Sequence, residues 1–268
     1  MSIVERAAVL LNCRQGVLSH GDGTRGNSTS CIPLKKKNEF EAIFRNFVTE
    51  FGGEILPEPS DVKVADYLFR KQNVVSELKC LVLDQTAEMN NKLTQVVKNW
   101  VKQHGKLPAG YDGGPLEIAK APKEISNPWL EILIAPLENV IKDANRQIRS
   151  TKERLNLPSA QGLLLIFNQG NLLHNRPQDF RWLVAKVLRK KRPTKELRFT
   201  HIQGVVYFSY ETVKTQQQNM SFWAAMQVQL TPGDDMKPME QFQKDLQQGW
   251  YSYVEKISGR PVRQHAGE

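Results

Sequence analysis

Residues Val74–Leu83 limit the possible folds more than any other segment, because apolar residues predominate on both faces of this run. A strand that is apolar on both faces belongs in the interior of a sheet that is covered on both sides. A second strand-like run, Ala65–Arg70, precedes it across the polar residues Lys71-Gln72-Asn73. Together the two runs predict a hairpin whose second strand lies centrally in a larger sheet.

Helical and strand-like patterns alternate around this hairpin. Apolar residues from Phe40 to Phe51 recur with the spacing of one helix face, and Gly52-Gly53 then ends that helix. Such alternation predicts an α/β fold with a mixed central sheet flanked by helices. Further helices are expected over residues 88–104, 136–157, 178–189 and 238–257, and further strands over 54–56, 162–168, 202–210 and 221–230.

Composition along the chain separates an appendage from a main domain. Residues 1–33 contain a Gly- and Ser-rich stretch and predict a flexible N-terminal appendage. Residues 34–268 are expected to form one domain with a core at about 38–168. A segment at 84–135, which ends in a loop rich in Gly and Pro, interrupts the core as an insertion. Residues 169–268 extend the core with further helices and strands.

Three Asp/Glu-x-Lys triplets occur in the chain, but only one of them lies inside a buried strand. Asp61-Val62-Lys63 precedes the hairpin, and Asp235-Met236-Lys237 follows a Pro-Gly pair in an apparent loop. In the third triplet, Glu77 and Lys79 share one face of the central strand because side chains alternate along a strand. A hairpin centred on the polar residues between the two strands places Asp66 directly opposite Glu77, on that same face.

Asp66, Glu77 and Lys79 would therefore converge on one spot of a largely apolar hairpin. Two carboxylates at that separation repel each other, and the repulsion raises the pKa of one of them. A divalent cation removes the conflict, and oxygen ligands suit Mg²⁺ or Mn²⁺. The alternative interpretation is a structural ion pair between Lys79 and either acid.

At these residues the sequence resembles the PD-(D/E)xK, or restriction-endonuclease-like, superfamily of nucleases, whose shared core is αβββαβ. The resemblance covers roughly residues 38–168 apart from the insertion, and Ala65 stands where the family often has proline. It implies Mg²⁺-dependent hydrolysis of phosphodiester bonds in nucleic acid, with DNA as the expected substrate. It also implies that Asp66, Glu77 and the backbone carbonyl of Leu78 hold the metal, and that Lys79 orients the attacking water.

Two further site residues are implied by the same resemblance. Many members carry a glutamate early on the first helix, where Glu41 is our choice and Glu39 and Glu50 remain alternatives. Some branches carry a glutamine on the helix after the third strand, and Gln147 occupies that helix. Each of these residues is equally compatible with an ordinary solvated position on a helix.

Charge and cysteine content bear on the partners and the compartment. The formal net charge of +9 and the pI of about 9.4 suit a polyanionic partner such as nucleic acid. Apolar runs such as Leu163–Phe167 are far too short to span a membrane, so no membrane partner is expected. Three cysteines without metal-ligand spacing and an N-terminus without a signal-peptide layout favour a cytoplasmic protein. The sequence leaves open whether the chain forms homo-oligomers.

A dense basic cluster and several tryptophans have less specific interpretations. Arg189-Lys190-Lys191-Arg192 with Lys195 follows a predicted helix, and the dipole of a helix end explains such a cluster as well as contact with DNA does. Trp182, Trp223 and Trp250 fall on apolar faces and are expected in the core.

The sequence therefore predicts a metal-dependent nuclease. One alternative is a catalytically silent nuclease-like module that binds nucleic acid or a protein partner. Another is an unrelated basic α/β scaffold whose acids form ion pairs.

Overall fold

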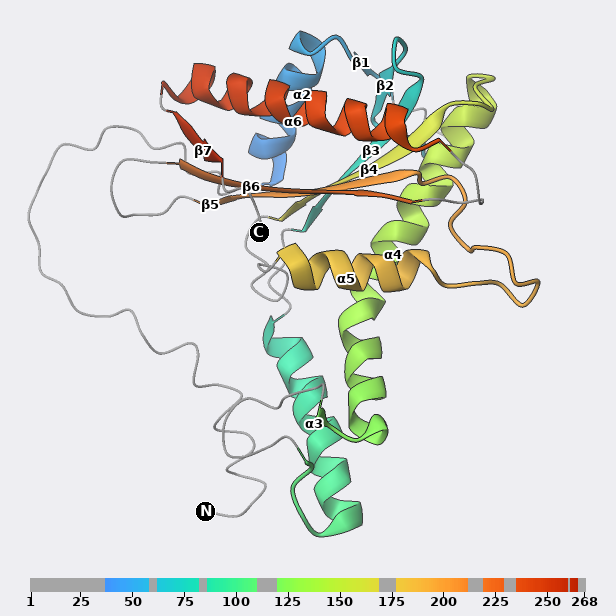
Figure 1. Cartoon of the computed structure of the whole chain (residues 1–268), viewed down its shortest axis with the longest axis vertical. Coiled ribbons are helices and arrows are strands. Elements are labelled where there is room, and N and C mark those ends of the chain that lie inside the picture. The colour runs from blue at the N-terminus through green and yellow to red at the C-terminus, as the bar shows by residue number, and fades with distance from the viewer. Residues whose placement is uncertain are drawn as a thin grey trace, which may run out of the picture. The chain divides into compact units, whose positions relative to one another are not determined.

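Within the described residues, seven strands form one mixed sheet whose spatial order follows the sequence (Figure 1). The computed structural model describes residues 37–57, 62–81, 86–109, 120–168, 177–211, 219–228, 235–259 and 261–264. The strands are β1 (Glu54–Ile55), β2 (Tyr67–Phe69), β3 (Val74–Leu81), β4 (Gln161–Asn168), β5 (Gly204–Glu211), β6 (Asn219–Gln227) and β7 (Val262–Gln264). The predicted α/β fold with a mixed sheet is thus confirmed.

The pairing of the strands places β3 and β4 in the interior of the sheet. Strand β3 pairs antiparallel with β2 and parallel with β4, and β4 pairs parallel with β5. The hairpin has the predicted register, because Tyr67 faces Ser76 and Leu68 faces Val75 across it. One further step along this register places Asp66, which directly precedes β2, opposite Glu77.

Helices cover both faces of this sheet (Figure 1). Helices α2 (Lys37–Glu50) and α6 (Lys237–Ser258) lie on one face, while α5 (Pro177–Leu188) and the C-terminal part of α4 (Lys123–Arg154) lie on the other. Alternation along β3 therefore separates two environments. Val74 and Leu78 point toward α2 and α6, whereas Glu77 and Lys79 point toward α4.

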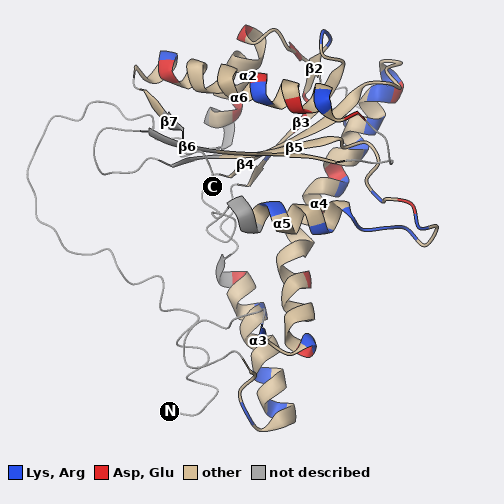
Figure 2. Cartoon of the chain, in the orientation of Figure 1, with Lys and Arg blue, Asp and Glu red and all other residues tan. Residues whose placement is uncertain are grey.

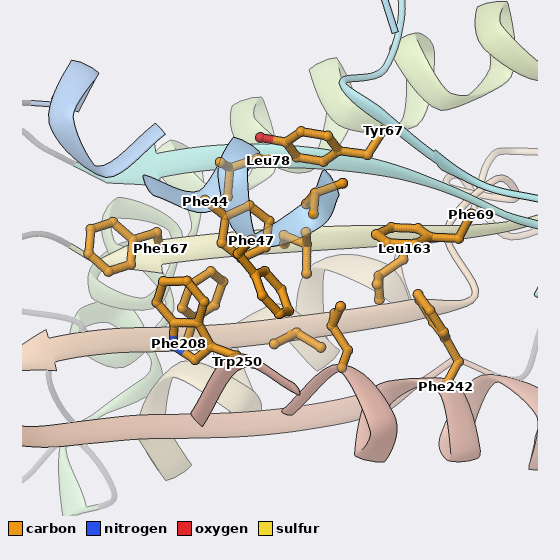
Figure 3. Close-up of a cluster of buried hydrophobic side chains, with 14 of the residues drawn as sticks. Phe44, Phe47, Tyr67, Phe69, Leu78, Leu163, Phe167, Phe208, Phe242 and Trp250 are labelled. Atoms are coloured by element: carbon orange, nitrogen blue, oxygen red, sulfur yellow. The ribbon is translucent and has the colours of Figure 1, made fainter. Parts of the chain in front are cut away.

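The face under α2 and α6 carries an aromatic core (Figure 3). Phe40 and Phe44 of α2 have no exposed surface, and the ring of Phe40 stacks on that of Phe167 in β4. Trp250 of α6 packs edge-on against Phe40 and Phe47. Because each buried aromatic ring removes a large apolar area from water, this layer fixes the positions of β2 and β3 that carry the acids.

The chain divides into two compact units, and Gln85–Pro136 belongs to a different unit from Cys31–Asp84 and Leu137–Glu268. Within Gln85–Pro136, α3 (Thr86–His104) pairs with the first turns of α4. Leu93 and Val97 of α3 are buried against Ile125 and Trp129 of α4. This small apolar cluster gives the helical pair a core of its own.

Helix α4 begins earlier than predicted. The sequence predicts a start at Pro136, but the helix runs from Lys123 and contains both Pro128 and Pro136. Proline inside a helix removes one backbone hydrogen bond and usually marks a boundary. Here the burial of Ile125 and Trp129 against α3 offsets that loss, and this packing partner is not evident from local sequence.

One other difference concerns a segment whose signal is weak. Strand β7 is not predicted, because three residues that pair with an edge strand have no periodicity of their own. The predicted N-terminal appendage, residues 1–33, lies outside the described residues. No described helix combines the length and the apolar composition that a membrane crossing requires.

Gly162 in β4 marks a close approach to the segment that precedes β5. A Cβ atom added there would lie 1.8 Å from the backbone oxygen of His201 and 2.9 Å from Cγ2 of Ile148 in α4. The Gln203 amide also donates to the Gly162 carbonyl, and the Gly162 amide donates to Oε1 of the Gln203 side chain at 2.6 Å. Only glycine leaves room for this crossing.

Gly162→Ala is expected to destabilise the protein by about 3 kcal/mol, the upper end for overpacking, because the backbone of His201 cannot move aside cheaply. Urea denaturation would measure the change in the free energy of unfolding. The neighbouring Gln161→Ala, at a half-buried position, is the control and should cost less than ~1 kcal/mol. Equal free energies of unfolding for the two variants would show that the segment before β5 moves aside without strain.

Candidate active site

The hairpin β2–β3 brings the two predicted acids to one place. The Leu78 amide donates a hydrogen bond to Oδ2 of Asp66 at 2.8 Å, which holds that carboxylate against the middle of β3. Glu77 is adjacent in sequence to Leu78 and is 1% exposed. The geometry predicted for Asp66 and Glu77, on one face and in register, therefore agrees with the structure.

Lys79 lies between an acid and an amide. Its Nζ atom is 2.6 Å from Oε1 of Glu77 and donates to Oε1 of Gln147 at 2.7 Å. A lysine ammonium has three N–H donors, so this arrangement leaves a third donor for another acceptor. The side chain of Lys79 is 25% exposed, and the free donor can therefore reach a ligand from solvent.

Helix α4 fixes this arrangement from the opposite side. The amide of Gln147 donates to the backbone oxygen of Val64 at 3.1 Å. One turn later, the hydroxyl of Thr151 accepts a hydrogen bond from the Ala65 amide at 2.7 Å and donates to the Gln147 carbonyl at 2.9 Å. Both side chains are buried, so α4 is tied to the two residues that directly precede Asp66.

Burial controls the ionisation of the acids. Desolvation, followed by the negative charge of Asp66, raises the pKa of Glu77 to about 8, although Lys79 opposes the shift. Desolvation also raises the pKa of Asp66 above its usual value, against the effects of the Leu78 amide and of Lys79. Oε2 of Glu77 is buried without a hydrogen-bond partner among the described residues. The pair is thus short of positive charge.

The acids and Lys79 line an open cavity of about 410 Å³. Its wall includes Glu41 and Arg45 of α2, Lys63 before β2, and Arg146 of α4. The charge of Glu41 adds to the rise in the pKa of Asp66, so this carboxylate acts on the same cluster. Arg146 forms an ion pair of 3.0 Å with Asp143, which also lines the cavity.

The structure distinguishes between the residues considered for the first helix. Glu41 lines the cavity, whereas Glu50 pairs with Lys256 of α6 at 2.9 Å and does not line it. The side chain of Glu39 lies outside the described residues. Gln147 lies in the cavity wall and contacts Lys79, so both of the chosen positions belong to one site.

Sequence reasoning missed Thr151, Arg45 and Lys63. Thr151 follows Gln147 by four residues, and that spacing places both on one helix face, which is the only local signal for it. Lys63 belongs to a triplet that precedes the hairpin, and Arg45 lies one turn after Glu41. The convergence of Arg45 and Lys63 depends on the packing of α2, α4 and the segment before β2 around one cavity.

The side chains fit a divalent cation in two respects. Both carboxylates have raised pKa values, and one buried carboxylate oxygen lacks a partner, so a positive ion would relieve both conditions. Within the described residues, no three His, Cys, Asp or Glu side chains converge as a metal site. Asp66 and Glu77 would therefore need a third ligand from the backbone or from water.

Comparisons with protein-family models, with curated proteins and with solved structures give no match.

The stability of the metal-free protein is expected to fall as pH rises from about 4.5 to about 8, because the folded state keeps a proton on Glu77 that the unfolded state has lost. This contribution is fully present below pH 4.5 and is lost through pH 8. Glu77→Gln should reduce this loss of unfolding free energy. The reduction at the high-pH end is at most about 5 kcal/mol, given 1.36 kcal/mol per pKa unit. Chemical denaturation in a chelating buffer across this range measures it.

Glu240→Gln provides the control, because Glu240 is exposed on α6, on the other face of the sheet, and its loss should leave the pH dependence unchanged. Wild-type and Glu77→Gln curves that run parallel from pH 4.5 to 8 would contradict the raised pKa of Glu77.

Thr151→Val keeps the shape of the side chain but removes the oxygen that accepts the Ala65 amide. The buried amide would then lack a partner, at a cost of about 1–3 kcal/mol. Thr151→Ser retains the hydroxyl and should recover most of this loss. Thermal denaturation of both variants compares them, and equal melting temperatures would mean that the hydrogen bond to Ala65 does not hold this segment.

Proposed function

We propose that the chain is a metal-dependent nuclease of the restriction-endonuclease-like type, which hydrolyses phosphodiester bonds in DNA. One observation carries the proposal above the others. Two carboxylates and a lysine, Asp66, Glu77 and Lys79, meet beside an open cavity, and a buried oxygen of Glu77 lacks a partner. A purely structural ion pair would have no need for a second acid, half-buried, beside the buried one.

The order of elements supports the same class of fold. Apart from α3, which belongs to the other unit, the chain runs α2, β1, β2, β3, α4 and β4. This is the αβββαβ order that the resemblance implies. The acids lie on β3 and directly before β2, and the predicted glutamine lies on the helix that follows β3.

The carboxylates of Asp66 and Glu77, with the backbone carbonyl of Leu78, would hold Mg²⁺ or Mn²⁺. Such an ion, when bound, supplies a water with a lowered pKa and withdraws charge from the phosphate. Asp66 keeps one oxygen available for this role, because Oδ2 accepts the Leu78 amide. Glu77 offers Oε2, and proton loss from its raised pKa would accompany binding.

Lys79 acts on the reacting groups. Two of its donors are used by Glu77 and Gln147, and the third is available to orient the attacking water or a phosphate oxygen. Water adds to phosphorus, the bond from phosphorus to one sugar oxygen breaks, and that oxygen gains a proton while the water loses one. The ammonium offsets the negative charge that grows on the phosphate during this step. Gln147 is a positioning residue that sets the direction of Lys79.

The remaining cations of the cavity suit a polyanionic substrate. Arg45 and Lys63 are exposed, and no ion pair joins either side chain to a described carboxylate. Both are therefore available to phosphates on either side of the bond that is cleaved. The net charge of +9 adds a general attraction for nucleic acid.

A gel assay of single-stranded, double-stranded and branched DNA and of RNA, with and without Mg²⁺, tests the proposed function. We expect cleavage of DNA that requires the metal and stops on chelation. Cleavage of RNA alone would mean that the substrate is RNA rather than DNA. Binding of these nucleic acids without cleavage would favour a catalytically silent nucleic-acid-binding module.

Glu77→Gln and Asp66→Asn should each lower the cleavage rate by ~10²-fold or more, because each removes the charge of a metal ligand while keeping its shape. Lys79→Ala should also reduce the rate but leave metal binding largely in place. Rates from a labelled DNA substrate and metal affinity from calorimetry separate the two effects.

Glu50→Gln is the matched control, since Glu50 is an acid of the same first helix whose partner is Lys256 and which does not line the cavity. Its cleavage rate should equal that of the wild type. Full activity in Glu77→Gln would refute the mechanism.

A further inference from the structure

The exposed face of α5 carries a tryptophan, contrary to the expectation that Trp182 lies in the core. Trp182 is 50% exposed, whereas Trp223 is half-buried and Trp250 is 3% exposed, as a core residue should be. The apolar face of α5 is instead formed by residues such as Phe180, whose ring stacks on Tyr207 of β5. A single exposed apolar side chain is common on protein surfaces, so Trp182 is informative only together with the charges beside it.

Two cations continue the exposed face on which Trp182 lies. Lys186 follows it by one turn, and its ammonium lies 5.4 Å from the centre of the Trp182 ring. Arg189, also exposed, comes one turn later, directly after the end of α5. Residues at these spacings share one side of a helix. The three residues form a stripe, here named the Trp182 stripe, in which an aromatic ring is followed by positive charge.

The basic cluster that follows the stripe forms a hairpin rather than a helix end. The Arg198 amide donates to the Lys190 carbonyl at 2.9 Å, and Lys191 pairs with Leu197 in an antiparallel bridge. A tight turn closes the far end, where the Lys195 amide donates to the Arg192 carbonyl. Residues 190–198 are named the basic hairpin below. The dipole of α5 therefore does not explain most of these cations.

Ion pairs hold the base of the hairpin and leave its outer cations available. Glu138 of α4 pairs with Lys190 at 2.7 Å and also with Arg198. By contrast, Lys191 and Arg192 are exposed, and no described carboxylate forms an ion pair with either of them. The hairpin is thus anchored by two of its cations, while Lys191, Arg192 and Lys195 are exposed. Figure 2 shows the lysines and arginines along this segment in blue.

Charge of this density points to a polyanion. Residues 177–199 contain eight lysines and arginines but only Asp179 and Glu196 as acids. A polymer of phosphates suits such a surface, because each phosphate that a cation neutralises releases counterions. The exposed indole adds a flat partner on which an unpaired base can stack. Both features together fit single-stranded nucleic acid better than an acidic protein, which has no stacking bases.

The surface lies on the same side of the sheet as the candidate active site. Lys79 of β3 is in register with Ile166 of β4, and Ile166 is in register with Tyr207 of β5. Residues in register across neighbouring strands share a face, so Lys79 and Tyr207 point the same way. Tyr207 contacts α5 through Phe180, and α5 therefore covers the face on which Lys79 lies.

We propose that the Trp182 stripe and the basic hairpin form a binding surface for single-stranded nucleic acid. Trp182 stacks on a base, and Arg189, Lys191 and Arg192 contact the phosphates on either side of it. This surface adds a substrate-binding region to the proposed function. Whether the bound strand is cleaved rests on the proposed nuclease activity. Binding itself requires neither metal nor hydrolysis.

The test uses the full chain in a chelating buffer and a fluorescein-labelled oligothymidylate, with anisotropy read across a series of salt concentrations. Lys191→Gln/Arg192→Gln should weaken binding and reduce the slope of log affinity against log salt by roughly 0.7 for each phosphate that the variant no longer neutralises. Lys237→Gln/Lys244→Gln removes the same charge from α6, on the other face of the sheet, and should leave the slope unchanged.

Trp182→Ala should lower the affinity at least ~5-fold without changing the salt slope, since stacking on one base contributes about 1–3 kcal/mol. Trp182→Phe keeps an aromatic ring and should retain most of the affinity. This contrast separates stacking from a change in charge, and all of these positions are exposed, so the variants should fold.

An unchanged affinity in Trp182→Ala, or an equal reduction in the hairpin and α6 variants, would overturn the proposal. Inorganic polyphosphate, which has no bases, should bind without dependence on Trp182, and a dependence equal to that of the oligonucleotide would also overturn it. Absence of cleavage with binding intact would refute the proposed nuclease activity alone. Metal-dependent cleavage with undiminished binding in the surface variants would refute this surface alone.

Discussion

The burial of Glu77 in a central strand is the constraint on which the rest of the site depends. A carboxylate that is 1% exposed loses nearly all of its hydration, and Asp66 next to it adds repulsion. Lys79 provides one compensating charge at 2.6 Å, but it leaves Oε2 of Glu77 without a partner. The fold tolerates this deficit because the opposite face of β3 is packed against the aromatic layer, whose rings bury a large apolar area.

Hydrogen bonds from neighbouring elements then fix the orientations of Asp66 and Lys79, which burial alone does not determine. The Leu78 amide holds Asp66, and Gln147 holds Lys79. Thr151 connects these two interactions, since it bonds both the backbone of Gln147 and the Ala65 amide next to Asp66. Asp66 and Lys79 are thus each oriented by a group that does not itself carry charge. Such support from neighbouring groups restricts the rotamers that Asp66 and Lys79 can adopt.

The sequence predicted most of the sheet because its evidence there is local. Alternation along β3 and a short polar turn were sufficient to place Asp66 opposite Glu77, and the register of β2 with β3 agrees. Thr151 could not be found in this way, because a buried threonine on a helix has no distinctive pattern. The start of α4 at Lys123 was missed for the same reason, since its first turns depend on Leu93 and Val97 of α3.

The prediction that Trp182 lies in the core was wrong because helical spacing identifies the apolar face of a helix but not how far around the helix that face extends. Phe180, Val184 and Val187 fill the buried face of α5, and Trp182 falls outside their arc. A core residue in that position would have packed against the sheet, as Phe180 does on Tyr207. The two faces of the sheet thus have different roles. Aromatic rings under α2 and α6 stabilise one face. On the other face β3 and the residue before β2 carry the acids, α4 carries the Gln147 amide, and α5 carries the exposed indole of Trp182.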